Sequence, residues 1–259
     1  MRMAAGSVRV RGLRYAYPDG RQALRGVDLD VAPGERVAVL GPNGAGKTTL
    51  VLHLNGILTA QAGEVAIGGL VVDPSDRAGL AEIRRRVGVV FQDPDDQLFM
   101  PTVREDVAFG PANLGLRGER LRERVEGALA AVGMSDRLDR VPHHLSYGEK
   151  RRVALAGVLA MDPQVLVLDE PSSNLDPAAR RELAEILSSL PVTLLMVTHD
   201  LPYAWQLCPR AVIMDEGRIV ADGPTGDLLA DAELLARHRL ELPYGFSVDG
   251  PAQPAAAAS

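Results

Sequence analysis

Short apolar runs separated by turn residues predict a β-rich beginning of the chain. The predicted strands are Val8–Val10, Val27–Val31 and Arg36–Leu40. Pro-Asp-Gly and Pro-Gly turn sequences follow the first and second of them. The third strand runs into a glycine-rich loop, Gly41–Gly46, and the pattern then predicts a helix over Lys47–Asn55. A strand, a loop and a helix therefore follow one another directly.

The pattern becomes helical after a fourth apolar strand, which is predicted at Val87–Phe91. Helices are predicted between about residues 93 and 160, most clearly over Glu119–Val132 and Glu149–Ala160. The later elements are the strands Val165–Leu168 and Thr193–Thr198, the helix Pro177–Leu190 between them, and a hairpin over residues 212–221. This order predicts an α/β fold in which a helical segment interrupts the strands.

Composition and charge narrow the classes of protein. A chain of 259 residues, 46% of them apolar, can bury a core as one large domain or two small ones. Its net charge of −6 argues against a nucleic-acid-binding protein, which is usually basic. Cys208 is the single cysteine, so an internal disulfide is excluded. No apolar run approaches the length of about 18 residues that a transmembrane helix needs.

A phosphate-binding loop is predicted between the third strand and its helix. The residues Gly41-Pro42-Asn43-Gly44-Ala45-Gly46-Lys47-Thr48 match the pattern G-x-x-x-x-G-K-[ST]. Glycines let backbone N–H groups turn toward a phosphate, and the next helix presents its positive amino end to the same anion. Lys47 is expected to reach the β- and γ-phosphates, and the Thr48 hydroxyl to coordinate Mg²⁺. Only two of the 28 basic residues are lysines, and Lys47 is one of them.

Two carboxylates follow the strand at Val165–Leu168. Side chains at the carboxyl end of a parallel strand meet ligands. Asp169 is therefore expected to hold Mg²⁺, and Glu170 to orient or deprotonate an attacking water. His199 ends the next strand and could contact a γ-phosphate. The alternative is that His199 caps the helix that follows, over residues 201–207.

A second candidate anion site precedes the helix at Glu149–Ala160. Its sequence is Leu145-Ser146-Tyr147-Gly148-Glu149-Lys150-Arg151-Arg152. Ser146 and Gly148 can leave backbone N–H groups available to an anion at the amino end of this helix. The alternative is an ordinary helix cap, in which Ser146 is the N-cap residue and Glu149 lies in the first turn.

These motifs, in this order, resemble the ATP-binding-cassette family. The ordered set is the phosphate loop, Gln92 after a strand, the Leu145–Glu149 signature, the acidic strand end, the turn Ser173-Asn174-Leu175-Asp176, and His199. The resemblance spans Val8 to about Leu229. It implies a RecA-like P-loop ATPase core with an antiparallel β subdomain and an inserted α-helical subdomain. It also implies ATP and Mg²⁺ as cofactors.

The resemblance assigns roles to particular residues. Tyr17 matches the aromatic residue that stacks on adenine, and Asp176 matches the aspartate that crosses the dimer interface. Gln92 matches the glutamine that couples the nucleotide to the transmembrane partner. The expected catalytic residues are Glu170, His199, Lys47 and Gln92, and the expected Mg²⁺ ligands are Thr48, Gln92 and Asp169. The expected nucleotide-binding residues are Tyr17, Gly41, Pro42, Asn43, Gly44, Ala45, Gly46, Lys47, Thr48, Thr49, Ser146, Gly148, Glu149 and Asp176.

A narrower resemblance is to the energy-coupling factor ATPases, which power bacterial importers of transition-metal ions and vitamins. It rests on the segments Phe91–Phe99, Val103–Gly110 and Asn113–Leu116. Leu54–Leu58 and the signature, with Tyr147 and Glu149, look like the cobalt/nickel branch. The signature departs from the family pattern, because most members carry Gly where Tyr147 stands and Gln where Glu149 stands. Ser146 and Gly148 are intact, so the phosphate contact is expected to survive.

The resemblance implies a peripheral ATPase at the cytoplasmic face of the cell membrane. A second ATPase subunit, identical or paralogous, is expected to bind head to tail, with each ATP between Lys47 of one chain and Ser146 of the other. The other expected partners are a transmembrane coupling subunit and a substrate-binding membrane subunit, and not nucleic acid. The ATPase domain is expected over residues 1–247, with the helical subdomain at about 93–160, and residues 248–259 are expected to form a disordered tail.

Three alternatives compete with this interpretation. A vitamin importer of the same group differs only in cargo, for which the chain shows no site. A soluble ATPase of DNA repair or translation is disfavoured because only residues 49–145 separate the loop from the signature, and the chain has one cassette. A P-loop kinase or GTPase predicts none of Ser146, Asp176 and His199. The adjacent His143 and His144 are expected to be solvated rather than to bind metal, because neighbours in sequence do not share a face.

Overall fold

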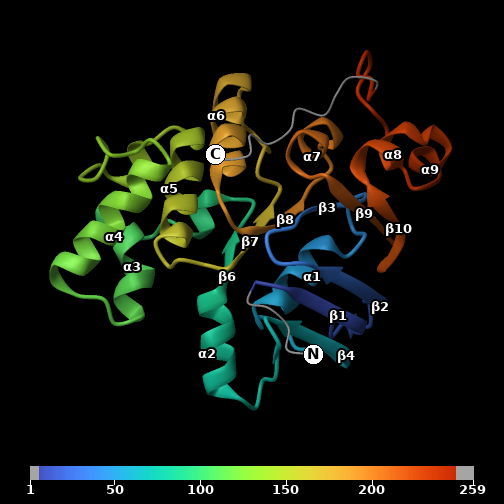
Figure 1. Cartoon of the computed structure of the whole chain (residues 1–259), viewed down its shortest axis with the longest axis horizontal. Coiled ribbons are helices and arrows are strands. Elements are labelled where there is room, and N and C mark those ends of the chain that lie inside the picture. The colour runs from blue at the N-terminus through green and yellow to red at the C-terminus, as the bar shows by residue number, and fades with distance from the viewer. Residues whose placement is uncertain (1–5, 249–259) are drawn as a thin grey trace.

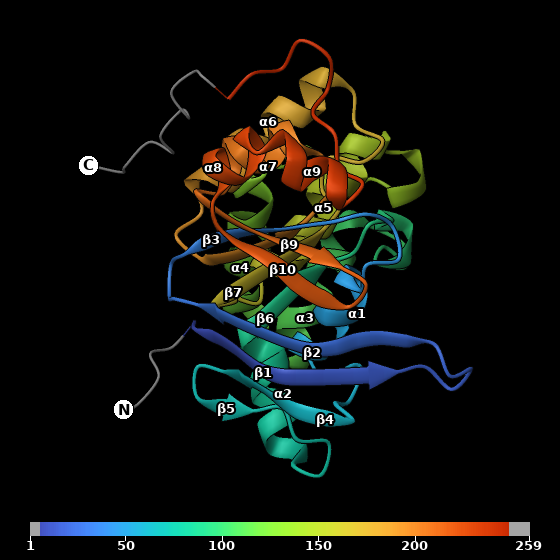
Figure 2. The same ribbon diagram turned by 90° about the vertical axis from the view of Figure 1, so that its right-hand side faces the viewer.

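A computed structural model describes residues 6–248, and its strands form two sheets (Figures 1 and 2). The first sheet is antiparallel, with the order β2-β1-β4-β5. Its strands are β1 (Val8–Ala16), β2 (Gln22–Val31), β4 (Ala62–Ile67) and β5 (Leu70–Val71). In Figure 2 this sheet lies below the second sheet, and the last four helices of the chain lie above the second sheet.

The second sheet carries the phosphate loop, and its strand order is β10-β9-β3-β8-β7-β6. Its strands are β3 (Arg36–Leu40), β6 (Val87–Val90), β7 (Val165–Asp169), β8 (Thr193–Val197), β9 (Arg210–Asp215) and β10 (Arg218–Pro224). Only β10 runs antiparallel to its neighbour; the other pairs in the sheet are parallel. The carboxyl ends of β3, β8 and β7 therefore lie side by side.

The helices cover the second sheet and form a group beside it. The three helices of that group pack on one another: α3 (Val103–Asn113), α4 (Gly118–Ala131) and α5 (Tyr147–Leu159). Figure 1 shows them on the left, away from the antiparallel sheet. The other helices are α1 (Lys47–Leu54), α2 (Arg77–Arg86), α6 (Pro177–Ser189), α7 (Leu201–Leu207), α8 (Thr225–Ala230) and α9 (Ala232–Arg237). The predicted α/β core, antiparallel β subdomain and inserted helical subdomain are confirmed.

Two apolar cores explain why the central strands are apolar throughout. In β3, Val37 and Val39 face a core between the two sheets, which also contains Leu50 of α1. Ala38 and Leu40 face the opposite core, which the helical group and the later helices cover. A parallel strand buried on both faces has no polar side, so it appears in the sequence as a continuous apolar run.

The predicted strands of the second sheet are confirmed to within three residues at either end, whereas the first sheet was predicted incompletely. Strands β1 and β2 are longer than predicted, and β4, β5 and α2 had no counterpart in the prediction. The predicted disordered tail, residues 248–259, lies outside the described residues except for Val248.

Candidate functional site

The loop before α1 requires glycine at two positions. Gly46, the N-cap residue of α1, has a φ of 103°, and a Cβ added there would lie 2.5 Å from the carbonyl oxygen of Ala23. A Cβ on Gly41 would lie 2.1 Å from the carbonyl oxygen of Met214. No side chain caps the amino end of α1, so its N–H groups remain available to an anion.

Lys47 lies over this loop with its side chain buried. Its ammonium donates hydrogen bonds to the carbonyl oxygens of Gly41 at 2.6 Å and Pro42 at 3.0 Å. Burial lowers the pKa of Lys47, and the nearby carboxylates of Glu170 and Asp169 oppose that shift. The lysine therefore places a positive charge beside the uncapped helix end, an arrangement that suits a phosphate.

Asp169, the last residue of β7, contacts Thr48 in the first turn of α1. The Thr48 hydroxyl donates to the Asp169 carboxylate at 2.9 Å. Burial raises the pKa of Asp169, and the hydrogen bond from Thr48 opposes this. Gln92 lines the same cavity as both residues. Hydroxyl, carboxylate and amide oxygens are the ligands that Mg²⁺ prefers, so these three residues fit a magnesium site.

Glu170 has a strained backbone and a firmly held carboxylate. Its φ is 48°, a left-handed conformation that is uncommon for any residue except glycine. One carboxylate oxygen accepts from the Thr198 hydroxyl at 3.1 Å, and the other lies 2.8 Å from Nδ1 of His199. The carboxylate therefore has a defined orientation at the carboxyl ends of β7 and β8.

The alternative role of His199 as a helix cap is wrong. Asp200 is the N-cap residue of α7, and its carboxylate accepts from the backbone N–H of Tyr203 at 3.1 Å. His199 instead leaves its side chain largely exposed and beside Glu170. His199 therefore lies beside Glu170 in the cavity of the phosphate loop, and its contact with a phosphate stays a prediction.

These side chains line one cavity of about 460 Å³. The lining residues are Tyr17, Arg21, Gln22, Ala23, Asn43, Gly44, Ala45, Gly46, Lys47, Thr48, Thr49, Gln92, Asp169, Glu170 and His199. The Tyr17 hydroxyl lies 3.1 Å from the Thr49 hydroxyl, and the Arg21 guanidinium lies 4.8 Å from the centre of the Tyr17 ring. An aromatic ring therefore lies in the same cavity as the phosphate loop, and its stacking on adenine stays a prediction.

Sequence reasoning missed Arg21 and Thr198. Arg21 stacks on the ring of Tyr17, and Thr198 holds Glu170. The only sequence signal for Thr198 was its position directly before His199 at a strand end, and Arg21 had no signal. The contact of Thr198 with Glu170 joins residues 28 positions apart, whereas Arg21 and Tyr17 both lie in the turn between β1 and β2.

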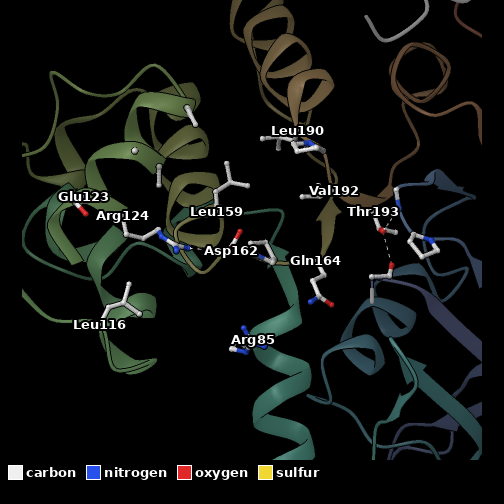
Figure 3. A pocket seen from close by; sticks show the side chains of 18 of the residues that line it. Arg85, Leu116, Glu123, Arg124, Leu159, Asp162, Gln164, Leu190, Val192 and Thr193 are labelled. Atoms are coloured by element: carbon white, nitrogen blue, oxygen red, sulfur yellow. Dashed lines mark hydrogen bonds and ion pairs between the residues drawn. The ribbon is translucent and has the colours of Figure 1, made fainter. Parts of the chain in front are cut away.

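A larger cavity, of about 910 Å³, lies at the other edge of the second sheet (Figure 3). Its lining includes Thr193, the first residue of β8, and Gln164, which directly precedes β7. Figure 3 shows Arg124 and Asp162 near the Leu159 side of this cavity. Ligands of α/β sheets bind outside the carboxyl ends of the strands. The smaller cavity is therefore the candidate site.

The signature residues lie outside the cavity that contains Lys47. Ser146 and Glu149 form a capping box on α5: the Ser146 hydroxyl accepts from the Glu149 N–H at 3.3 Å, and the Glu149 carboxylate accepts from the Ser146 N–H at 2.8 Å. The alternative role of Ser146 as an N-cap is thus confirmed for a single chain. Neither residue lines the cavity that contains Lys47.

Gly148 and Asp176 have structural roles of their own. A Cβ on Gly148 would lie 2.9 Å from the Cβ of Ala179, so α5 and α6 can approach closely only with glycine there. Asp176 caps α6, accepting from the N–H groups of Ala178 and Ala179 at 2.8 and 2.9 Å. Within one chain, Ser146, Gly148, Glu149 and Asp176 are therefore not brought to Lys47.

Residues 6–248 show neither a membrane-spanning helix nor a cluster of metal ligands. No helix in this part of the chain combines the length and the apolar character that crossing a membrane requires. No group of three or more His, Cys, Asp or Glu side chains in the same range could hold a metal ion. His143 and His144 lie in a short 3-10 turn, Pro142–His144, and both are exposed.

Comparison with known proteins identifies relatives along almost the whole chain. The family model described as ABC transporter matches residues 24–173. A Streptomyces coelicolor protein, provisionally named an ABC transporter ATP-binding protein, is 68% identical over 94% of this chain and 92% of its own. The energy-coupling factor transporter ATP-binding protein of Methanothermobacter thermautotrophicus is 52% identical over 91% of this chain and 76% of its own. The predicted resemblance to energy-coupling factor ATPases is confirmed.

Solved structures give the same result. CbiO1 of Clostridium perfringens, described as part of the ABC transporter complex CbiONQ, is 39% identical. It superposes with a TM-score of 0.79 over 91% of this chain and 95% of its own. A dimeric ATP-binding cassette in a post-hydrolysis state, bound to ADP and Pi, is 28% identical, with a TM-score of 0.75 over 84% of this chain and 98% of its own. Since the family model covers more than half of the sequence and the relatives match at high identity, the chain belongs to the ABC transporter family as one of its ATPases.

Proposed function

We propose that the chain powers the uptake of cobalt or nickel ions as the ATPase subunit of an energy-coupling factor importer at the cytoplasmic face of the membrane. The observation that carries the ATPase role is the convergence of Lys47, Asp169 and Glu170 on one cavity. The cargo rests on the resemblance of Leu54–Leu58 and of the signature, with Tyr147, to the cobalt/nickel branch. The similarity to CbiO1 and to an energy-coupling factor ATP-binding protein supports the type of transporter.

The residues that line the cavity have different roles in ATP hydrolysis. Lys47 and the N–H groups of α1 hold the β- and γ-phosphates. Glu170 orients and deprotonates the attacking water, since its carboxylate is fixed by Thr198 and His199. Thr48, Asp169 and Gln92 would hold Mg²⁺, which supplies positive charge to the phosphate oxygens when bound.

Two chains are required for a complete ATP site in this proposal. Ser146 caps its own helix on a surface outside the Lys47 cavity, so a phosphate can contact both residues only if a second chain supplies one of them. The dimeric solved cassette, 28% identical, supports such an arrangement. The partner is a second copy or a paralogue, bound head to tail.

Mixed dimers test this arrangement. A Ser146→Arg chain and a Glu170→Gln chain are each expected to be inactive alone. In their mixed dimer one site carries both defects and the other carries none, so mixing is expected to restore activity. Absence of activity in mixed dimers that demonstrably form would contradict the shared site. Mixing two batches of Ser146→Arg chains is the matched control and is expected to restore nothing.

An exposed aromatic pair supports a membrane partner. Phe99 and Phe109 are 62% and 42% exposed, and their rings meet edge to face at 5.0 Å. They line an apolar groove of about 220 Å³ between α3 and α5, together with Val158 and Met161. Exposed apolar surface of this kind marks interaction sites. We propose that the transmembrane coupling subunit docks here, near Gln92.

Deletion of the gene tests the cargo. Uptake of radiolabelled cobalt or nickel is expected to fall in the deletion strain and to return with the wild-type chain, but not with Glu170→Gln. Normal metal uptake with impaired uptake of a vitamin such as biotin or riboflavin would overturn the metal cargo and leave the ATPase in place.

Purification of the chain from native membranes tests the partners. Membrane subunits are expected to co-purify with it and can then be identified. A preparation without any membrane subunit would favour a soluble ATPase.

A further inference from the structure

The amino end of α5 is bound to the segment that follows β6. The Tyr147 hydroxyl donates a hydrogen bond to the backbone carbonyl of Gln92 at 3.1 Å. The Arg151 guanidinium donates to the backbone carbonyl of Phe91 at 2.9 Å. The ammonium of Lys150 lies 2.7 Å from the Asp95 carboxylate. These three contacts fix the start of α5 to the segment that contains Gln92.

Arg151 connects this contact to the loop after Glu170. Its side chain is 1% exposed, and its guanidinium lies 5.4 Å from the centre of the Tyr147 ring. It donates to the Tyr147 hydroxyl at 3.2 Å and, at a longer 3.4 Å, to the backbone carbonyl of Ser173. A buried guanidinium with a fixed fork geometry orients its partners more strongly than a flexible ammonium would. One side chain thus contacts the segment after β6, the start of its own helix α5 and the loop after Glu170.

The contact between Tyr147 and Gln92 matters because Gln92 and Ser146 lie at different ATP molecules in the proposed dimer. Gln92 lines the cavity of its own chain, whereas Ser146, which directly precedes Tyr147, faces the ATP of the partner. The hydrogen bond from the Tyr147 hydroxyl would pass a displacement of the Gln92 backbone to the start of α5. The glycine that most family members carry in place of Tyr147 has no side chain to make this contact.

We infer that Tyr147 and Arg151 are positioning residues that couple the two ATP sites, so that occupancy of one chain's cavity sets the position of the Ser146 end that it offers to its partner. The inference rests on the proposed head-to-tail dimer. Coupling of this kind appears as cooperativity between sites, and its loss leaves two independent sites.

The test uses Tyr147→Phe, which keeps the ring and removes only the hydroxyl. The wild-type chain is expected to hydrolyse ATP with a Hill coefficient above 1, and Tyr147→Phe to lower it to about 1. Its kcat is expected to fall about threefold to tenfold, the effect of one hydrogen bond, while the affinity of the single chain for ADP stays within about twofold. Tyr244→Phe is the matched control, because Tyr244 is fully exposed and loses the same hydroxyl.

A second variant tests whether the two residues act together. Arg151→Lys keeps the charge and loses the fork, and its Hill coefficient is also expected to fall to about 1. In the double variant, Tyr147→Phe is expected to lower the Hill coefficient and kcat little beyond the effect of Arg151→Lys. Both substitutions disrupt the same contact, so their effects are not additive. Thermal unfolding of each variant identifies any that fails to fold, and Tyr147→Phe then decides alone.

The outcomes separate the inference from the function on which it rests. A wild-type Hill coefficient of about 1, or a Tyr147→Phe variant with an unchanged Hill coefficient, would overturn the coupling and leave the ATPase role intact. A wild-type chain that hydrolyses no ATP and forms no dimer would overturn the proposed function itself.

Discussion

The amino ends of α1 and α5 are both candidate phosphate sites, but they are built differently. The α1 end begins at Gly46 in a left-handed conformation, with no side chain on its N–H groups, inside a cavity. The α5 end begins at Ser146, which is exposed, and a capping box already uses the N–H groups of Ser146 and Glu149. The first end leaves its N–H groups available to an anion, whereas at the second end side chains satisfy two of them.

This difference implies an order of events. An anion at α1 meets free N–H donors and a buried ammonium, so one chain can bind nucleotide there alone. An anion at α5 must share or displace the hydrogen bonds of Ser146 and Glu149. Closure on α5 is therefore expected to follow binding at α1 and to contribute less free energy.

The largest expected effect concerns the chemistry that belongs to the α1 end. Glu170→Gln keeps the shape of the side chain and removes the base, so kcat is expected to fall about 10²- to 10⁴-fold. ATP binding is expected to persist, and the ATP-bound dimer to accumulate in size-exclusion chromatography. Hydrolysis near the wild-type rate would show that Glu170 is not the base.

The next effect tests binding at the same end. Lys47→Ala removes the charge over the loop and is expected to weaken ATP binding roughly tenfold to a hundredfold, as measured by calorimetry on the single chain. Lys47→Arg is expected not to restore it, because the planar fork does not fit where the ammonium reaches Gly41 and Pro42. Full activity of the arginine variant would contradict this geometry.

A smaller effect is expected at the α5 end. Ser146→Ala removes the cap and is expected to lower the free energy of unfolding by about 1 kcal/mol. Nucleotide affinity of the single chain is expected to stay within about twofold, because Ser146 does not line that chain's cavity. Equal losses of affinity from Ser146→Ala and Lys47→Ala would remove the distinction between the two ends.

The smallest effect depends on pH. The hydrogen bond from the Ser146 backbone lowers the pKa of Glu149 from 4.5, burial opposes this, and Arg137 adds to the lowering. Glu149 therefore stabilises the fold fully above pH 4.5, and this contribution is lost as pH falls through the lowered pKa. Glu149→Gln is expected to reduce the acid dependence of the urea midpoint by an amount worth less than about 1 kcal/mol. An unchanged acid dependence would show that the capping box contributes nothing measurable.

The second sheet could be predicted from the sequence because its central strands are buried on both faces and appear as continuous apolar runs. The first sheet could not be predicted in full. In β1 the register shifts between Val10 and Leu13, so the buried residues stand three apart and the alternation of a strand is lost. In α2 only Ile83 is buried, so no apolar stripe marks the helix.

The phosphate loop and the acidic pair could also be predicted, because their spacing is fixed by local chemistry. The contacts of Glu170 with Thr198 and His199 could be expected only once β7 and β8 were known to be neighbours. The left-handed backbone of Glu170 gave no signal, since nothing in its side chain favours that conformation. The contact of Tyr147 with Gln92 joins residues far apart in sequence and likewise had none.

The place of β3 in its sheet has a consequence for synthesis on the ribosome. The first sheet uses residues 8–71 only, so it can form while the rest of the chain is still being made. Strand β3 pairs with β8 and β9, whose Leu195 and Ala211 arrive much later. Until then a strand that is apolar from Val37 to Leu40 lacks both of its neighbours. This strand and the phosphate loop after it can then aggregate or bind chaperones. Nascent chains that end before residue 193 are expected to contain the whole loop and yet to bind no nucleotide.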